Sequence, residues 1–153
     1  MVVIVTKQED TKYWILVASK NHVMRGVEGR FCQANHGKEA PLRRMKQEDW
    51  IIFYSPKETF EGNSPLRKFT AMGKIKDDCV YQVEIDTDFH PFRRNVEFLA
   101  VNETSIEPLI SELSFIKNKK SWGYVFKFGL VQIPRQDFLA IASRMLPAYQ
   151  EAV

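Results

Sequence analysis

The sequence Trp50-Ile51-Ile52-Phe53-Tyr54-Ser55 combines aromatic and β-branched residues and contains no charge. Short runs of this composition form buried strands, so we predict a central strand here that ends at Pro56. Residues 13–18 have the same character and predict a second buried strand. Both runs are far shorter than the roughly 20 apolar residues of a membrane-spanning helix, so no membrane association is expected.

Outward from these strands, the sequence predicts short elements of both kinds. We expect a short helix after Ser19 that Gly26 and Gly29 end, and then a long polar loop over residues 30–48. A strand at 69–75, a hairpin turn at 76–78, a returning strand at 80–85 and a strand at 92–100 follow. Residues 106–113 favour a helix, 122–132 show no clear period, and a helix with one apolar face begins near Pro134.

Few regular helices separate the strands, which argues against a doubly wound fold. The fold class expected is α+β: a strongly bent, mixed or antiparallel sheet that forms an open barrel of about five or six strands flanked by helices. The chain has 153 residues, enough for one domain with a hydrophobic core, and we predict a single domain over residues 1–153.

Charge and cysteine content narrow the function. The formal net charge is +3 and the pI about 8.8, which weakly favours a polyanionic partner. The first residues lack the basic start of a signal peptide, so a cytoplasmic protein is expected. Neither Cys32 nor Cys79 lies in a CxxC pair. Cys32 and His36 are four residues apart, but no second half-site completes a zinc ligand set, so we expect no metal and no cofactor.

Signatures of enzymes are missing from the sequence. It has no GxSxG, Walker A or HExxH pattern, so we predict that the protein is not an enzyme. The alternative is covalent chemistry by Cys32 with His36 as its base. Such a pair works best with a third group that orients the base, and the sequence supplies no evident candidate.

Several segments resemble the EVE domain family of the PUA-like superfamily, in order and spacing. They are Tyr13-Trp14-Ile15, Gly26 to Gln33, His36-Gly37-Lys38, Pro41 to Met45, Asp49 to Pro56, Phe92-Arg93-Arg94 and Phe115 to Trp122. The resemblance implies a PUA-like fold, related to that of YTH domains, which read methylated adenine in RNA. It also implies nucleic acid as the partner, DNA or RNA, with a modified or flipped base as the feature recognised. A module that binds a free nucleoside or another small molecule is the alternative.

Recognition of such a base needs aromatic faces for stacking, polar groups for the base edge and cations for phosphates. Adjacent strands would bring the turn at 19–22, the loop at 31–38 and the strand end at 54–57 together. The base-pocket candidates are Trp14, Ser19, Asn21, Phe31, Gln33, Tyr54, Ser55, Phe60 and Trp122. The phosphate-contact candidates are Lys38, Arg43, Arg44, Arg93 and Arg94. Structural interpretations compete with these roles: Trp14 as core, Ser19 as a helix cap and Ser55 as a strand end.

Overall fold

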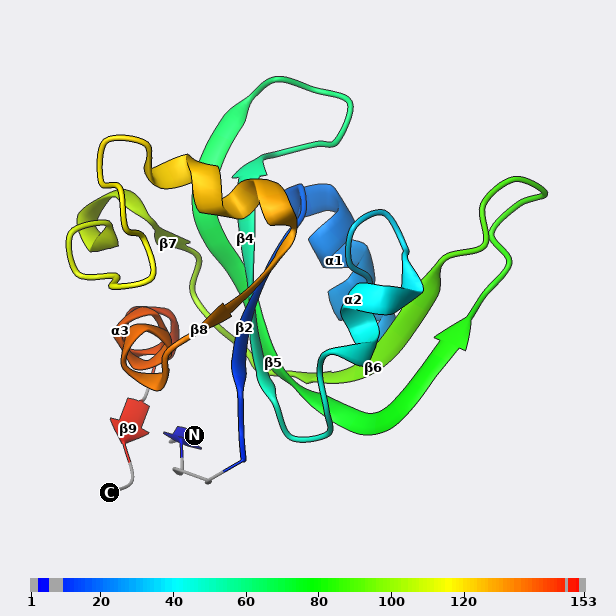
Figure 1. Ribbon diagram of the computed structural model, residues 1–153, viewed down its shortest axis with the longest axis horizontal. Coiled ribbons are helices and arrows are strands. Elements are labelled where there is room, and N and C mark those ends of the chain that lie inside the picture. The colour runs from blue at the N-terminus through cyan, green and yellow to red at the C-terminus, as the bar shows by residue number, and fades with distance from the viewer. Residues whose placement is uncertain (1–2, 6–9, 148, 152–153) are drawn as a thin grey trace.

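The computed structural model describes residues 3–5, 10–147 and 149–151. A seven-stranded sheet that does not close into a barrel forms its centre (Figure 1). Its strands are β2 (Tyr13–Val17), β3 (Phe31–Cys32), β4 (Trp50–Lys57), β5 (Pro65–Gln82), β6 (Phe92–Phe98), β7 (Thr104–Ser105) and β8 (Leu130–Ile133). They lie in the order β3-β6-β5-β4-β2-β8, with β7 beside β5. The pair β2–β4 is parallel and the other pairs of this sheet are antiparallel, so the predicted mixed α+β fold is confirmed.

Helices lie on both sides of this sheet (Figure 1). They are α1 (Lys20–Gly29), α2 (Glu39–Arg43), α3 (Arg135–Met145) and the 3₁₀ helices η1 (Glu107–Leu109) and η2 (Trp122–Phe128). Near the chain ends, β1 (Val3–Val5) pairs in parallel with β9 (Tyr149–Glu151). Residues 1–2 and 6–9, which bear on the expectation of no signal peptide, lie outside the described residues. Within the described part, no helix is both long and apolar enough to cross a membrane.

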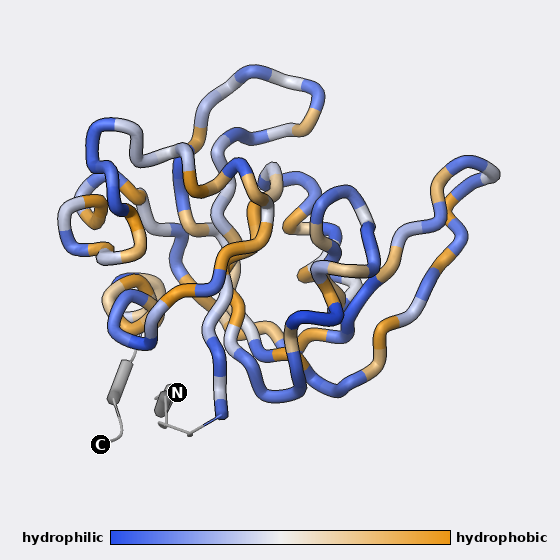
Figure 2. Tube along the Cα trace, viewed as in Figure 1, coloured by the Kyte–Doolittle hydropathy of each residue, from blue (hydrophilic) through white to orange (hydrophobic). Residues whose placement is uncertain are grey.

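The central strands β2 and β4 are buried on both faces. Figure 2 shows the hydropathy of the residues along the sheet. Along β2, Tyr13 and Ile15 pack into one core cluster with Phe138 of α3, whereas Trp14 and Leu16 pack into a second. That second cluster also contains residues of α1 and α2. The alternation follows from the two-residue period of a strand. Because both faces of these strands are covered, a binding site next to them lies at their ends.

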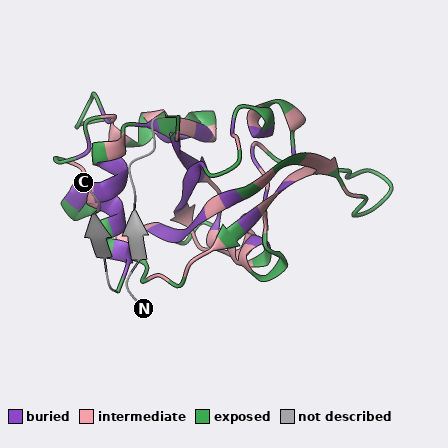
Figure 3. Cartoon of the chain, turned by 90° about the horizontal axis from the view of Figure 1, so that it is seen from below, coloured by how far each residue is buried: buried purple, intermediate pink, exposed green. Residues whose placement is uncertain are grey.

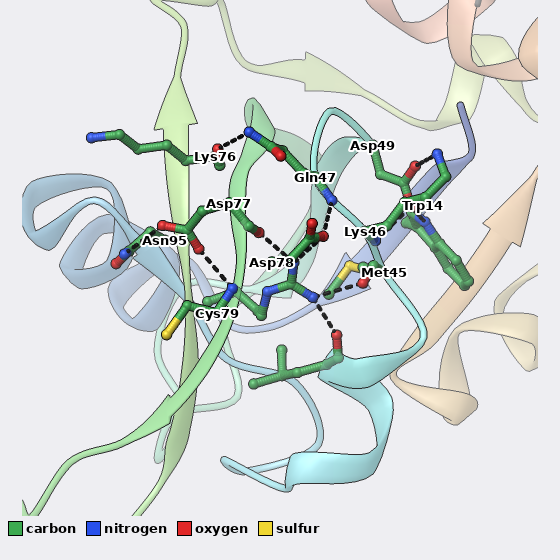
Figure 4. A network of polar contacts seen from close by, with 12 residues as sticks. Trp14, Met45, Lys46, Gln47, Asp49, Lys76, Asp77, Asp78, Cys79 and Asn95 are labelled. Carbon is green, nitrogen blue, oxygen red and sulfur yellow. Dashed lines mark hydrogen bonds and ion pairs between the residues drawn. The ribbon is translucent and has the colours of Figure 1, made fainter. Parts of the chain in front are cut away.

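One strand differs from the prediction. We expected a hairpin turn at residues 76–78, but β5 runs through them to Gln82, and the residues before and after them, 73–75 and 80–82, both pair with β6. The pairing register shifts between Ile75 and Val80. Asp77 fixes this bulge because its carboxylate accepts hydrogen bonds from Asn95 Nδ2 and the Cys79 backbone N–H, at 3.0 Å each (Figure 4). The hairpin turn lies instead within residues 83–91, beyond the end of β5, on an arm that projects from the sheet (Figures 1 and 3).

Other boundaries also differ. Strand β4 continues through Pro56 with an irregular register, and residues 106–113 form only the short helix η1. The predicted loop at 30–48 contains β3 and α2, and the ambiguous stretch at 122–132 is η2 followed by β8. Helix α1 does not stop at Gly26: a Cβ there would lie 2.6 Å from the Phe31 carbonyl oxygen. Glycine therefore serves the close approach of the chain entering β3, not a helix end.

Candidate functional site

A cavity of about 830 Å³ lies beside the carboxyl ends of β2 and β4. Because these two strands are parallel, Ala18-Ser19 after β2 and Pro56-Lys57 at the end of β4 reach the same edge of the sheet. The start of α1, the segment 31–38, the η2–β8 junction and the arm between β5 and β6 complete the wall. The cavity is of the size that holds a small ligand or one unit of a polymer.

On one wall of the cavity, the Arg93 guanidinium stacks on the Phe31 ring. The Arg93 guanidinium lies 3.7 Å from the centroid of the Phe31 ring, and its Nε donates a 2.8 Å hydrogen bond to Gln33 Oε1. Both the ring stacking and the hydrogen bond fix the direction of Arg93. The wall therefore presents a positive charge that is already oriented before any ligand arrives.

Phe60 forms a lip of the cavity. It is 46% exposed, and it lies between His22, stacked at 5.2 Å between ring centroids, and His36, at 5.6 Å edge-on. Asn21 holds this lip in place, because its Oδ1 accepts hydrogen bonds from Ser19 Oγ at 2.7 Å and from the Phe60 backbone N–H at 3.3 Å. A partly exposed aromatic ring is thus fixed at the cavity mouth, with Lys57 Nζ 5.5 Å from its centroid.

Next to Phe60, the segment 31–38 turns sharply through three successive residues with positive φ. They are Asn35 (47°), His36 (62°) and Gly37 (87°). Residues other than glycine adopt this region seldom, and Asn and His are enriched among those that do. Gly129 packs beneath this turn at φ 77°, and a Cβ there would overlap Asn35 Oδ1. Gly129 connects η2 to β8, and glycine is required there because the Asn35 side chain lies so close.

The charged side chains that line the cavity have one sign. Its lining residues that the structure describes include five cations and no carboxylate; the cations are Arg25, Lys38, Lys57, Arg93 and Lys127. His22 is uncharged near neutral pH, since burial, and then Arg25, lower its pKa below 6.5. An anionic ligand would find complementary charge on several sides.

Six of the sequence-predicted residues line this cavity: Ser19, Phe31, Gln33, Lys38, Phe60 and Arg93. Asn21 lies just behind it and positions Ser19 and Phe60. The remaining seven do not line it.

Four of those seven are interior. Trp14 is buried, and its Nε1 donates a 2.9 Å hydrogen bond to Asp49 Oδ2. Tyr54 is buried against Phe126 with ring centroids 4.3 Å apart, and burial raises its pKa to about 12. Ser55 Oγ lies 2.8 Å from Thr70 Oγ1 in the buried strand pair β4–β5. Arg94 is 1% exposed and donates to the carbonyl oxygens of Leu42, Met45 and Asp77.

The other three lie elsewhere on the surface or at the core margin. Trp122 is partly buried and packs edge-on against Tyr54 and Phe126. Arg43 is exposed and pairs with Glu39 one turn earlier, Nε to Oε2 at 2.6 Å. The Arg44 guanidinium lies 5.2 Å from the centroid of the Trp14 ring. Each of these side chains therefore has a structural partner away from the cavity.

Cys32 contributes to the cavity wall but is 1% exposed. Burial raises the pKa of its thiol to about 12, so the reactive thiolate is scarce at neutral pH. Among the residues that the structure describes, no three His, Cys, Asp or Glu side chains gather in a way that could hold a metal ion.

Sequence reasoning missed the contributions of η2 and the β5–β6 arm. Lys127 and Phe128 come from the stretch without a clear period, and Ile85 and Phe89 come from the arm that was assigned to a strand and a loop. The run Tyr124 to Phe128, which mixes exposed aromatics with a lysine just before Gly129, is the signal that could have indicated a binding rim.

Comparison with protein families shows that residues 12–144 match the EVE domain. Among curated relatives, a UPF0310 protein of Mycolicibacterium vanbaalenii is 52% identical over 133 residues, which cover 87% of this chain and 92% of that protein. A UPF0310 protein of Bacillus licheniformis is 50% identical and covers 84% of this chain and 87% of that protein.

Among solved structures, the fold resembles the YTH domain of the Zygosaccharomyces rouxii MRB1 protein, determined in complex with N6-methyladenosine RNA. The TM-score is 0.56 at 12% identity, and the match covers 89% of this chain and 87% of that one. The likeness is one of fold, and it agrees with the bent open sheet described above.

Proposed function

The chain belongs to the EVE domain family, and we propose that it binds nucleic acid by taking one modified or extruded base of DNA or RNA into the cavity. In this proposal Phe60 supplies a stacking face, Ser19 and Gln33 approach the base edge, and the cations hold the flanking phosphates. The proposed function includes no chemical step. Cys32 is the nucleophile of the alternative interpretation, and its thiol is buried with a pKa that burial raises to about 12.

The observation that carries the proposal is the pairing of an exposed aromatic lip with lining charges of one sign. Apolar surface alone would suit many ligands, and basic surface alone would suit any anion. A base on a phosphate backbone needs both at one place, since stacking holds the base and cations hold its neighbours' phosphates. A solved YTH domain of the same fold is bound to N6-methyladenosine RNA, which supports this class of ligand.

The test is a binding screen with labelled oligonucleotides. Short single- and double-stranded DNA and RNA, each with one central N6-methyladenine, 5-methylcytosine or unmodified base, are titrated at low salt and compared with the free nucleosides. We expect an oligonucleotide to bind, and to bind more tightly than its nucleoside. No binding to any oligonucleotide would overturn the proposal, and equal, salt-independent binding of the nucleoside would favour a small-molecule module instead.

Phe60→Ala is expected to weaken binding of the preferred oligonucleotide by about tenfold or more, because base–aromatic stacking contributes roughly 1–3 kcal/mol. Phe60 is 46% exposed, so the midpoint of thermal unfolding should stay near that of the wild type. Phe60→Trp preserves a stacking face and serves as the control. Unchanged affinity in Phe60→Ala would remove this lip from the site.

Binding should strengthen as the pH falls through the range below 6.5. His22 is held neutral by burial, Arg25 and His36, against the opposing effect of Glu61. A phosphate nearby favours its protonated form, so binding takes up a proton and affinity rises on acidification. The measurement is the dissociation constant of one oligonucleotide at pH 7.5 and at lower pH, compared with His22→Gln. A pH dependence that is identical in both proteins would contradict the assignment to His22.

A further inference from the structure

The exposed large hydrophobic side chains converge on one place. Among the described residues they are Phe60, Ile85, Phe89, Tyr124 and Phe128. All but Tyr124 line the cavity, and the Tyr124 ring contacts Phe128 edge-on at 5.8 Å between centroids. Exposed apolar residues scattered singly need no explanation, but a gathering around one opening indicates a contact surface.

Apart from Phe60, these side chains form two groups, one on η2 and one on the arm. The charged residues beside the two groups have opposite signs. On η2, Tyr124 and Phe128 are each 60% exposed, and Lys127 Nζ lies 5.4 Å from the centroid of the Tyr124 ring. On the arm, Ile85 and Phe89 are interleaved with the exposed carboxylates of Glu84, Asp86 and Asp88 (Figures 2 and 3). A phosphate backbone would be attracted to the first group and repelled by the second.

We infer that Tyr124, Lys127 and Phe128 form a stacking platform for the nucleotide next to the one in the cavity. The inference rests on the proposed function and adds the path of the strand: away from the acidic arm and across η2. Lys127 is placed to meet the phosphate between the two nucleotides, and the aromatic pair offers a face for the neighbouring base. Single-stranded binding proteins combine aromatic faces and cations in this way.

The experiment uses the oligonucleotide from the screen above that the wild type binds, alongside versions with an abasic site immediately before or after the central base. Tyr124→Ala and Phe128→Ala should each weaken binding of the complete oligonucleotide by about tenfold. One of the two abasic probes should bind the wild type about tenfold more weakly, and that probe should lose little further affinity in the variants. Tyr124→Phe should bind as the wild type does.

His90→Ala on the arm is the matched control, because its ring is exposed and lies outside the cavity lining, and it should have a much smaller effect. Platform variants that bind as tightly as the wild type, or a His90→Ala variant that loses more, would overturn this inference while the proposed function stands. Absence of any oligonucleotide binding by the wild type would overturn both. Because the side chains of Tyr124 and Phe128 are largely exposed, thermal unfolding should show that the variants remain folded.

Discussion

Arg94→Ala is expected to lower the free energy of unfolding by about 3–5 kcal/mol. The guanidinium is buried and donates to three carbonyl oxygens. They belong to Leu42 at the end of α2, to Met45 just after it and to Asp77 in the β5 bulge. Removing it takes this donor away from all three carbonyl oxygens, of which Leu42 O still accepts from the Met45 backbone N–H, and leaves a void between a helix and the sheet. Urea denaturation monitored by tryptophan fluorescence measures the change.

Arg94→Lys should recover only part of this loss, because an ammonium group does not reach three carbonyls as a planar guanidinium does. Arg43→Ala is the contrasting control. Its guanidinium is exposed and pairs with Glu39, so its effect should stay within about 0.5 kcal/mol of the wild type. If Arg94→Ala were as stable as Arg43→Ala, a structural role for Arg94 would be wrong.

Reversing three rim charges should reduce oligonucleotide affinity by about 100-fold or more, since like charges facing a polyanion cost several kcal/mol. The variant carries Arg25→Glu, Lys38→Glu and Lys127→Glu, all at exposed residues of the cavity lining. The matched control carries the same reversals at Lys76, Lys117 and Lys120, which are exposed and outside the lining. Fluorescence anisotropy at fixed salt compares the two.

Both triple variants change the net charge equally, so a general effect of charge would weaken them alike. We expect the control to retain most of its affinity, because screening at physiological salt limits the reach of a surface charge to about 8 Å. Equal losses in the two variants would mean that binding depends on total charge and not on this rim.

Most of the fold that could be predicted from the sequence came from the apolar runs of its strands. Continuous apolar runs at 13–18 and 50–55 correctly indicated central buried strands, since a strand that is covered on both faces carries apolar side chains at successive positions. The bulge at 76–79 escaped prediction because two adjacent aspartates usually indicate a turn. Distant partners, among them Gln47, Arg94 and Asn95, keep this segment within one strand.

The arginine pair on β6 shows the corresponding limit for the site. The sequence suggested that Arg93 and Arg94 both contact phosphate, but neighbours on a strand point to opposite faces. The same period could have predicted that only one of them reaches the cavity, although not which one. Arg93 faces Phe31 and the cavity, whereas Arg94 faces the end of α2. The contribution of the arm depends on contacts between distant segments, which no local pattern encodes.

The salt dependence of oligonucleotide binding tests the central proposal most directly. If one base occupies the cavity and the exposed cations Arg25, Lys38 and Lys127 neutralise phosphates, the logarithm of the affinity for a single strand should fall with the logarithm of salt concentration. Three such contacts predict a slope of roughly −2, from about −0.7 for each phosphate, with no slope for the free nucleoside. An oligonucleotide affinity that does not change with salt would contradict the account.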